Sequence, residues 1–156
     1  MASGMYNKGL REILDGTIDP DTDVLKLVLV DNTYVYNADH EVFDTGTNDV
    51  NDPSFCELSC TNYTPGWGSA SRKAPTVAIA EDDGTNRVNI SIADLTWTAL
   101  GGAANDTVGG VILLKEGGAN DTTSRLLAWF DLADTATNGS DVTLNFDATA
   151  NIYFGV

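Results

Sequence analysis

The chain has 156 residues, 42% of them hydrophobic, and carries 23 acidic against 8 basic residues, a formal net charge of −15. We expect one globular domain spanning residues 1–156. The acidic excess argues against nucleic-acid binding, which depends on Lys and Arg, and against docking on an anionic membrane. No apolar run approaches the roughly 20 residues that span a bilayer. The first residues lack the apolar core of a signal peptide, so we expect a protein that is made in a cytoplasm and is soluble there.

The N-terminal residues show a helical period. Apolar side chains recur with the 3.6-residue spacing of one helix face, which predicts a short helix over about residues 4–14. This stripe consists of Tyr6, Leu10, Ile13 and Leu14. We expect Ser3 as the N-cap and Gly16 as the left-handed residue that ends the helix. Gly9 weakens a helix by about 1 kcal/mol relative to Ala, so this one needs tertiary packing.

Most of the chain after residue 23 shows the sequence patterns of β-strands. The run "VLKLVLVD" (24–31) is apolar without a helical stripe and predicts a strand buried on most of both faces. Asp83-Gly84 is a turn signal between two further strands. The later predicted strands are "TVAIA" (76–80), "RVNISI" (87–92), "LTWTAL" (95–100), "VGGVILLKE" (108–116), "SRLLAWFDL" (124–132), "DVTLNFD" (141–147) and "NIYFGV" (151–156). The sequence therefore predicts a mainly β single domain, a β-sandwich or jelly-roll-like fold with a short N-terminal helix.

One long segment, about residues 37–74, matches neither pattern. It contains both cysteines and "NYTPGWGS" (62–69), and loops of this length are commonly functional or ordered by a partner. Trp67 lies between glycines and is expected to be exposed or to contact a partner, whereas Trp97 and Trp129 lie within strand patterns and are expected in the core.

The acidic stretch "DGTIDPDTD" (15–23) has the alternate carboxylates of a calcium loop. An EF-hand loop requires glycine at position 6 and glutamate at position 12, but here those positions hold Pro20 and Lys26. A turn built on Asx hydrogen bonds explains the stretch better. Weak calcium binding by the acidic loops stays open.

No catalytic or cofactor motif is present. His40 is the only histidine and is expected to pack in a loop. Cys56 and Cys60 have too few potential partner ligands for a zinc site and are expected to be partly buried, although their redox state stays open. We therefore expect no enzyme, cofactor or metal site.

The order of these pieces resembles a family of small virion structural proteins of tailed bacteriophages. The resemblance runs from "YNKGLREILDGTIDPDTDVLKLVLVDNTYVYNADHEVF" (6–43) through "CTNYTPGW" (60–67), "VNISIADLTWTAL" (88–100) and "VGGVILLKE" (108–116) to "LLAWFDLADTATNGSDVTLNFDATANIYFGV" (126–156). Pro65, Trp67 and "ATANIYF" (148–154) depart from the family pattern, which bears on the partner surface more than on the fold.

The resemblance implies a head decoration, or cement, protein on the outer capsid surface of a virion. It implies the major capsid protein as partner and a homo-oligomer, usually a trimer. The candidate contacts are Tyr6, Leu10 and Ile13 on the helix and Tyr63 and Trp67 in the long segment. Alternatively, the helix stripe covers one end of the sandwich. The competing functions are a tail- or fibre-associated module that contacts a carbohydrate receptor and, with less support, an acid-pair glycosidase.

Overall fold

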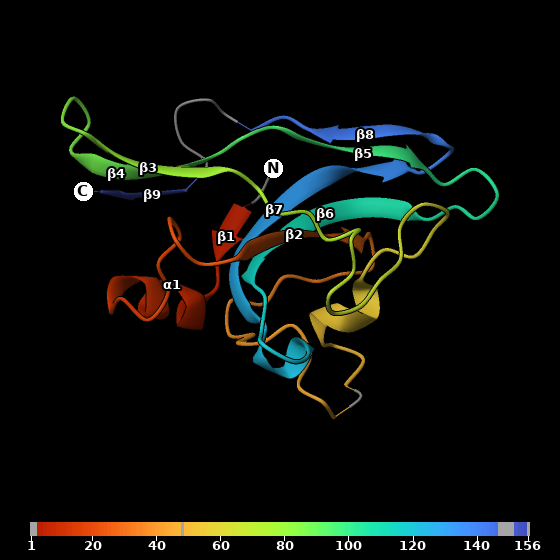
Figure 1. The fold of residues 1–156 in the computed structure, drawn as a ribbon, viewed down its shortest axis with the longest axis horizontal. Coiled ribbons are helices and arrows are strands. Elements are labelled where there is room, and N and C mark those ends of the chain that lie inside the picture. Colours follow the sequence, from red (N-terminus) through yellow and green to blue (C-terminus); the bar gives the residue numbers. More distant parts are fainter. Residues whose placement is uncertain (1–2, 48, 147–151, 156) are drawn as a thin grey trace.

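The computed structural model describes residues 3–47, 49–146 and 152–155, and a four-stranded antiparallel sheet forms its centre (Figure 1). The strand order is β1-β7-β6-β2. The longest apolar runs of the sequence form its inner strands, where both edges of a strand are paired. The strands are β1 (Ser3–Met5), β2 (Leu25–Asp31), β6 (Thr107–Lys115) and β7 (Arg125–Ala136).

Both faces of this sheet are buried. Leu25, Leu27 and Leu29 point into one apolar core, while Val28 and Val30 point into a second core on the opposite face. Side chains alternate between the faces of a strand, so burial on both sides requires a continuous apolar run. The predicted doubly buried strand at 24–31 is confirmed.

A second layer of strands covers one face (Figure 1). It consists of a sheet with the order β3-β4-β9 and a pair, β5-β8. The strands are β3 (Val77–Asp82), β4 (Arg87–Ile92), β9 (Ile152–Gly155), β5 (Leu95–Leu100) and β8 (Ser140–Leu144). Trp97 is 2% exposed in the core between the layers. The mainly β, sandwich-like fold is confirmed.

Residues 37–56, which include the 3-10 helix η1 (Pro53–Cys56), cover the other face together with the short helix η2 (Asp121–Thr123), whereas Leu58 and Tyr63 of the same segment pack into the core between the strand layers (Figure 1). Phe43 contributes to the core beneath residues 37–56, where Trp129 is 6% exposed. The core placement predicted for Trp97 and Trp129 is therefore confirmed.

Two predicted strands, 141–147 and 151–156, include residues that the structure does not describe. These are residues 147, 151 and 156.

The N-terminal helix α1 (Asn7–Leu14) is shorter than predicted. Ser3 belongs to β1 and Tyr6 occupies the N-cap position, so the predicted Ser3 cap is wrong; pairing of β1 with β7 competes for those residues. Gly16 has a φ of 76° and ends the helix as predicted. Gly9 is buried, and a Cβ atom there would overlap the carbonyl oxygen of Leu126, so close packing on β7 requires this glycine.

No helix within the described part of the chain has the length and apolar character needed to cross a bilayer.

Candidate interaction surface

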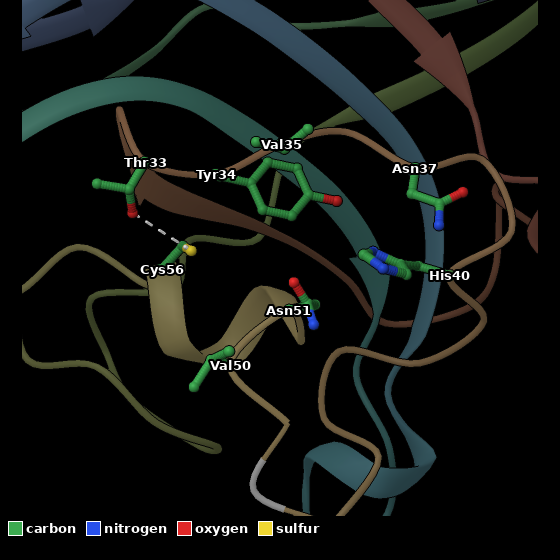
Figure 2. Close-up of a pocket in the computed structure, with 8 residues that line it drawn as sticks. All are labelled: Thr33, Tyr34, Val35, Asn37, His40, Val50, Asn51 and Cys56. Atoms are coloured by element: carbon green, nitrogen blue, oxygen red, sulfur yellow. Dashed lines mark hydrogen bonds between the residues drawn. The ribbon is translucent and has the colours of Figure 1, made fainter.

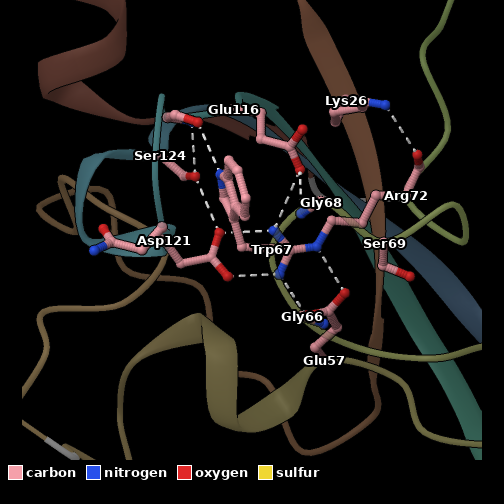
Figure 3. A network of polar contacts seen from close by, with 12 residues as sticks. Lys26, Glu57, Gly66, Trp67, Gly68, Ser69, Arg72, Glu116, Asp121 and Ser124 are labelled. Carbon is pink, nitrogen blue, oxygen red and sulfur yellow. Dashed lines mark hydrogen bonds and ion pairs between the residues drawn. The ribbon is translucent and has the colours of Figure 1, made fainter.

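The guanidinium of Arg72 connects the 37–74 segment to the rest of the molecule (Figure 3). Its Nε donates to Glu57 Oε1 at 2.9 Å and its Nη2 to Glu57 Oε2 at 2.6 Å. On its other side, Nη1 and Nη2 donate to the two carboxylate oxygens of Asp121 at 2.7 and 2.8 Å. Glu116 Oε1 lies 3.8 Å from Nη1. We call Arg72, Glu57, Glu116 and Asp121 the Arg72 network.

The Arg72 network is buried and retains its charge. The Arg72 side chain is 0% exposed and that of Glu57 is 2% exposed. Burial acts to lower the pKa of the Arg72 guanidinium, but its hydrogen bonds to Glu57 and Asp121 outweigh burial and raise that pKa. The guanidinium carbon also lies 4.7 Å from the centre of the Phe43 ring. An irregular segment is thus fixed by a paired internal charge in addition to isolated backbone bridges, such as those between Leu27 and Lys73 and between Val30 and Glu57.

Trp67 is held at the surface by this network (Figure 3). The backbone N–H of Gly66 donates to Glu57 at 2.9 Å, and that of Gly68 donates to Glu116 at 3.2 Å. The indole Nε1 donates to the carbonyl of Gly117 at 2.8 Å, yet the residue remains 44% exposed. The predicted exposure of Trp67 is confirmed, and its ring is the part that a partner can reach.

Two predicted contact residues lie in the interior, which corrects their assignment to a partner surface. Tyr63 is 2% exposed; its hydroxyl accepts the N–H of Leu29 at 3.1 Å and donates to Glu57 at 3.3 Å. Tyr6 is 0% exposed, and its hydroxyl lies 2.6 Å from that of Tyr34. A buried tyrosine places its ring in the core when its hydroxyl has a partner. Neither side chain is available to another protein.

The helix residues occupy intermediate positions. Leu10 and Ile13 are half-buried, and Ile13 packs against the core between the layers. Leu14, which the predicted stripe also included, is 70% exposed. The packing of α1 on β7 supports the alternative in which the helix covers one end of the sandwich. Partner contacts by Leu10 and Ile13 stay a prediction.

A hollow of about 250 Å³ opens beside the 37–74 segment (Figure 2). We call it the Val35 hollow, and it is lined by Thr33, Tyr34, Val35, Asn37, His40, Val50, Asn51 and Cys56. Val35 and Val50 on its rim are 79% and 73% exposed. Phe55, next to Cys56 in the chain, is 51% exposed. The rim therefore presents apolar side chains to solvent.

The polar groups of the Val35 hollow do not form an activated nucleophile. Burial raises the pKa of the Cys56 thiol, which disfavours the reactive thiolate, and Thr33 Oγ1 donates to its sulfur at 3.5 Å. His40 is half-buried in a loop, as predicted. Its Nδ1 has no hydrogen-bond partner among the described residues.

Cys60, the second cysteine, is like Cys56 a free, half-buried thiol. Its pKa is raised by burial too. The predicted partial burial of both cysteines is confirmed.

The acidic stretch 15–23 forms a turn. Asp15 accepts the N–H of Thr17 at 3.1 Å, and Asp19 accepts that of Asp21 at 3.0 Å. Asp23 accepts the N–H of Asp19 at 2.9 Å and pairs with Lys115 at 2.8 Å. These carboxylates stabilise their own backbone, as the Asx-turn interpretation predicts. Within residues 3–47, 49–146 and 152–155, no three His, Cys, Asp or Glu side chains are grouped to hold a metal ion.

Sequence reasoning missed the Arg72 network. Arg72 and Lys73 are the two basic residues of segment 37–74, which carries six acidic ones. This excess of acidic over basic residues indicates that several carboxylates can share one basic side chain. It is the feature of the sequence from which the network could have been predicted. The partners Glu57 and Asp121 are separated from Arg72 by 15 and 49 positions.

Comparison with protein-family models, curated protein sequences and solved structures finds no match to this chain.

Proposed function

We propose that the protein is a virion structural protein that binds the outer surface of a bacteriophage head as a decoration, or cement, protein. The single observation that carries a binding role is that the 37–74 segment, fixed by the buried Arg72 network, keeps apolar side chains exposed. Exposed apolar side chains on a fixed surface bind without a large ordering cost. The sequence resemblance to phage structural proteins supports a partner within a virion, and we propose that this partner is the head.

The proposed mechanism is stabilisation by preferential binding. A domain that binds adjacent subunits of the assembled shell, and not separated subunits, stabilises the shell by about 2.7 kcal/mol per site at 100 times Kd. The partner is the major capsid protein, and the proposed assembly is a trimer on the outer surface of the virion. The net charge of −15 keeps the protein away from the packaged nucleic acid.

The test uses heads assembled without this protein. Purified protein is added, the heads are sedimented, and the bound copies are counted while survival of the heads on heating is recorded. We expect saturation at a fixed number of copies per capsomer and survival at higher temperature. Heads that neither bind the protein nor gain heat resistance would contradict the proposal.

Matched surface variants locate the contact. Val50→Ser removes an exposed apolar group from the Val35 hollow, and Leu14→Ser does the same on α1. Neither is expected to change the free energy of unfolding by more than about 0.5 kcal/mol. We expect Val50→Ser to weaken head binding more than Leu14→Ser does.

A second candidate function rests on Trp67. Its N–H is already used, so only the ring face is free, which is the geometry that stacks on a sugar. A tail- or fibre-associated carbohydrate module would show a saturable, sugar-dependent change in tryptophan fluorescence that Trp67→Ala abolishes. Absence of that change across a panel of bacterial surface glycans would exclude this function.

A further inference from the structure

Among the strands that the structure describes, β3 forms an open edge of its sheet. The order β3-β4-β9 places β3 at one end, and among the described strands it pairs with β4 alone. Figure 1 shows the β3–β4 hairpin extending away from the central sheet, on the side opposite residues 37–56 and η1. Protein sheets usually protect such an edge with a charge, a proline or a bulge. The middle of β3 is Ala78-Ile79-Ala80 in unbroken register, with none of these devices.

The backbone groups at this edge can be assigned from the ladder. Ala93 N–H donates to the carbonyl of Thr76 at 3.0 Å, which makes that pair hydrogen-bonded. In an antiparallel ladder, hydrogen-bonded and non-hydrogen-bonded pairs alternate. Val77, Ile79 and Glu81 therefore direct their N–H and C=O groups away from β4, toward the open side.

The same strand has an apolar face that continues from the core to the surface. Ile79 lies opposite Ile90 and on the same face as Val88. Ile90 is 3% exposed in the core, whereas Ile79 and Val88 are each 41% exposed. The apolar face of the β3–β4 hairpin thus continues from the buried core to a part that is exposed to solvent.

Two hollows flank the edge. One, of about 220 Å³, is lined by residues that include Val24, Pro75 and Val77. The other, of about 290 Å³, is lined by residues that include Ala78 and Phe146. Val77 and Ala78 point to opposite faces of the strand, so side chains of an added strand would alternate toward these two hollows.

The charged side chains near the β3 edge indicate which kind of partner segment would bind there. Glu81 and Asp83 are exposed at the hairpin tip, and Asp21 lines the hollow at the other end. Asp82 is paired with Arg87 at 3.5 Å. This distribution favours an extended segment with an apolar centre and flanking Lys or Arg side chains. A second copy of a chain with a net charge of −15 is disfavoured by repulsion.

We infer that the open edge of β3 accepts such a basic and apolar segment as an added strand. In assigning the segment to a capsid subunit, the inference rests on the proposed function. A cement protein must contact two subunits. The β3 edge provides a contact on the opposite side of the central sheet from residues 37–56, where Val50 and Phe55 are exposed.

Paired variants separate backbone pairing from side-chain contact. Ile79→Pro removes an outward N–H, which is tolerated on an edge strand because the bonds to β4 come from Ala78 and Ala80. Ile79→Ala removes the side chain and retains the N–H. Added-strand pairing predicts head binding at least about tenfold weaker for Ile79→Pro than for Ile79→Ala, as expected for a lost hydrogen bond with added steric conflict. Equal binding by the two variants would overturn the inference.

Hydrogen exchange on the unmodified protein gives a readout that does not depend on a variant folding. The amides of Val77, Ile79 and Glu81 should exchange rapidly in the free protein and slowly on heads, while those of Ala78 and Ala80 stay protected in both. Heads that bind without protecting the outward amides would overturn the strand addition and leave the proposed function intact. Concentration-dependent protection in the free protein would assign the edge to a second copy and also overturn it.

If heads do not bind at all, the proposed function fails and the edge is tested separately. The probe is the synthetic peptide Lys-Lys-Val-Thr-Val-Thr-Val, whose lysines would lie beside the acidic tip in antiparallel pairing. Protection of the outward amides by this peptide, abolished by Ile79→Pro, would support strand addition. No protection at millimolar peptide would overturn it.

Discussion

The two faces of the central sheet are covered in different ways. One face is covered by strands, whose backbone groups pair in ladders and whose apolar side chains fill the core between the layers. The other is covered by residues 37–56 of the 37–74 segment, which has one short 3-10 helix. This segment is held by the Arg72 network and by isolated backbone bridges. Stability is therefore spread over many contacts on the first face. On the second face it is concentrated in a few, where single substitutions have large effects.

The largest expected effect follows from Arg72→Met, which leaves Glu57 and Asp121 without their buried partner. Breaking a buried ion pair from one side costs about 3–5 kcal/mol, so the free energy of unfolding should fall by that amount in urea denaturation. The matched control is Arg11→Met. Its guanidinium lies 3.8 Å from Asp15 and its side chain is 72% exposed, so no measurable loss is expected. Equal stability of the two variants would show that the network does not hold the segment.

The next prediction compares neighbours on β6. Leu113 points into the core between the strand layers and Leu114 into the core beneath the 37–74 segment. Each change to Ala should cost about 2–5 kcal/mol. Hydrogen exchange should separate them: Leu113→Ala should speed exchange in β4 and β5, and Leu114→Ala in residues 37–56. Identical exchange patterns would contradict the division of the sheet into two faces.

A smaller effect is expected at high pH. Burial raises the pKa of Tyr34 from 10.0 to about 12, and burial also raises that of Tyr6. A raised folded-state pKa contributes stability that is complete below pH 10 and declines as the pH rises toward 12. For Tyr34 the loss approaches about 2.7 kcal/mol. Tyr34→Phe should reduce the decline measured by urea denaturation between pH 9 and 12; an unchanged slope would contradict the assignment.

The smallest effect is expected in the acidic turn. The hydrogen bond from Lys115, followed by that from the Asp19 N–H, lowers the pKa of Asp23. A lowered pKa contributes stability at neutral pH that is lost as the pH falls through the folded-state value. Because the pair is partly exposed, Asp23→Asn should cost only about 0.5 kcal/mol at pH 7 and less at pH 2. A loss of the same size at both pH values would point to a cause other than charge.

The sequence predicted the strand-covered face far better than the other. The apolar run around Leu27 and the alternating pattern around Ile90 are local signals, and each produced the expected strand. Short β1 was missed because three residues carry no periodic signal. The candidate contact residues show the same difference between local and distant signals. Trp67, which lies between two glycines, is exposed as predicted. Tyr63 is buried because its hydroxyl forms hydrogen bonds with Leu29 and Glu57, which are not its neighbours in the sequence. The pairing of Arg72 depends on tertiary contacts that no local pattern encodes.

Hydrogen exchange of the protein bound to heads tests the central claim most directly. The claim is that the 37–74 segment, held by the Arg72 network, presents the surface that contacts the shell. The account predicts that amides of this segment near Val50 and Phe55 become protected on binding while those of β5 and β8 do not change. Protection confined to β5 and β8, with the segment unchanged, would contradict it.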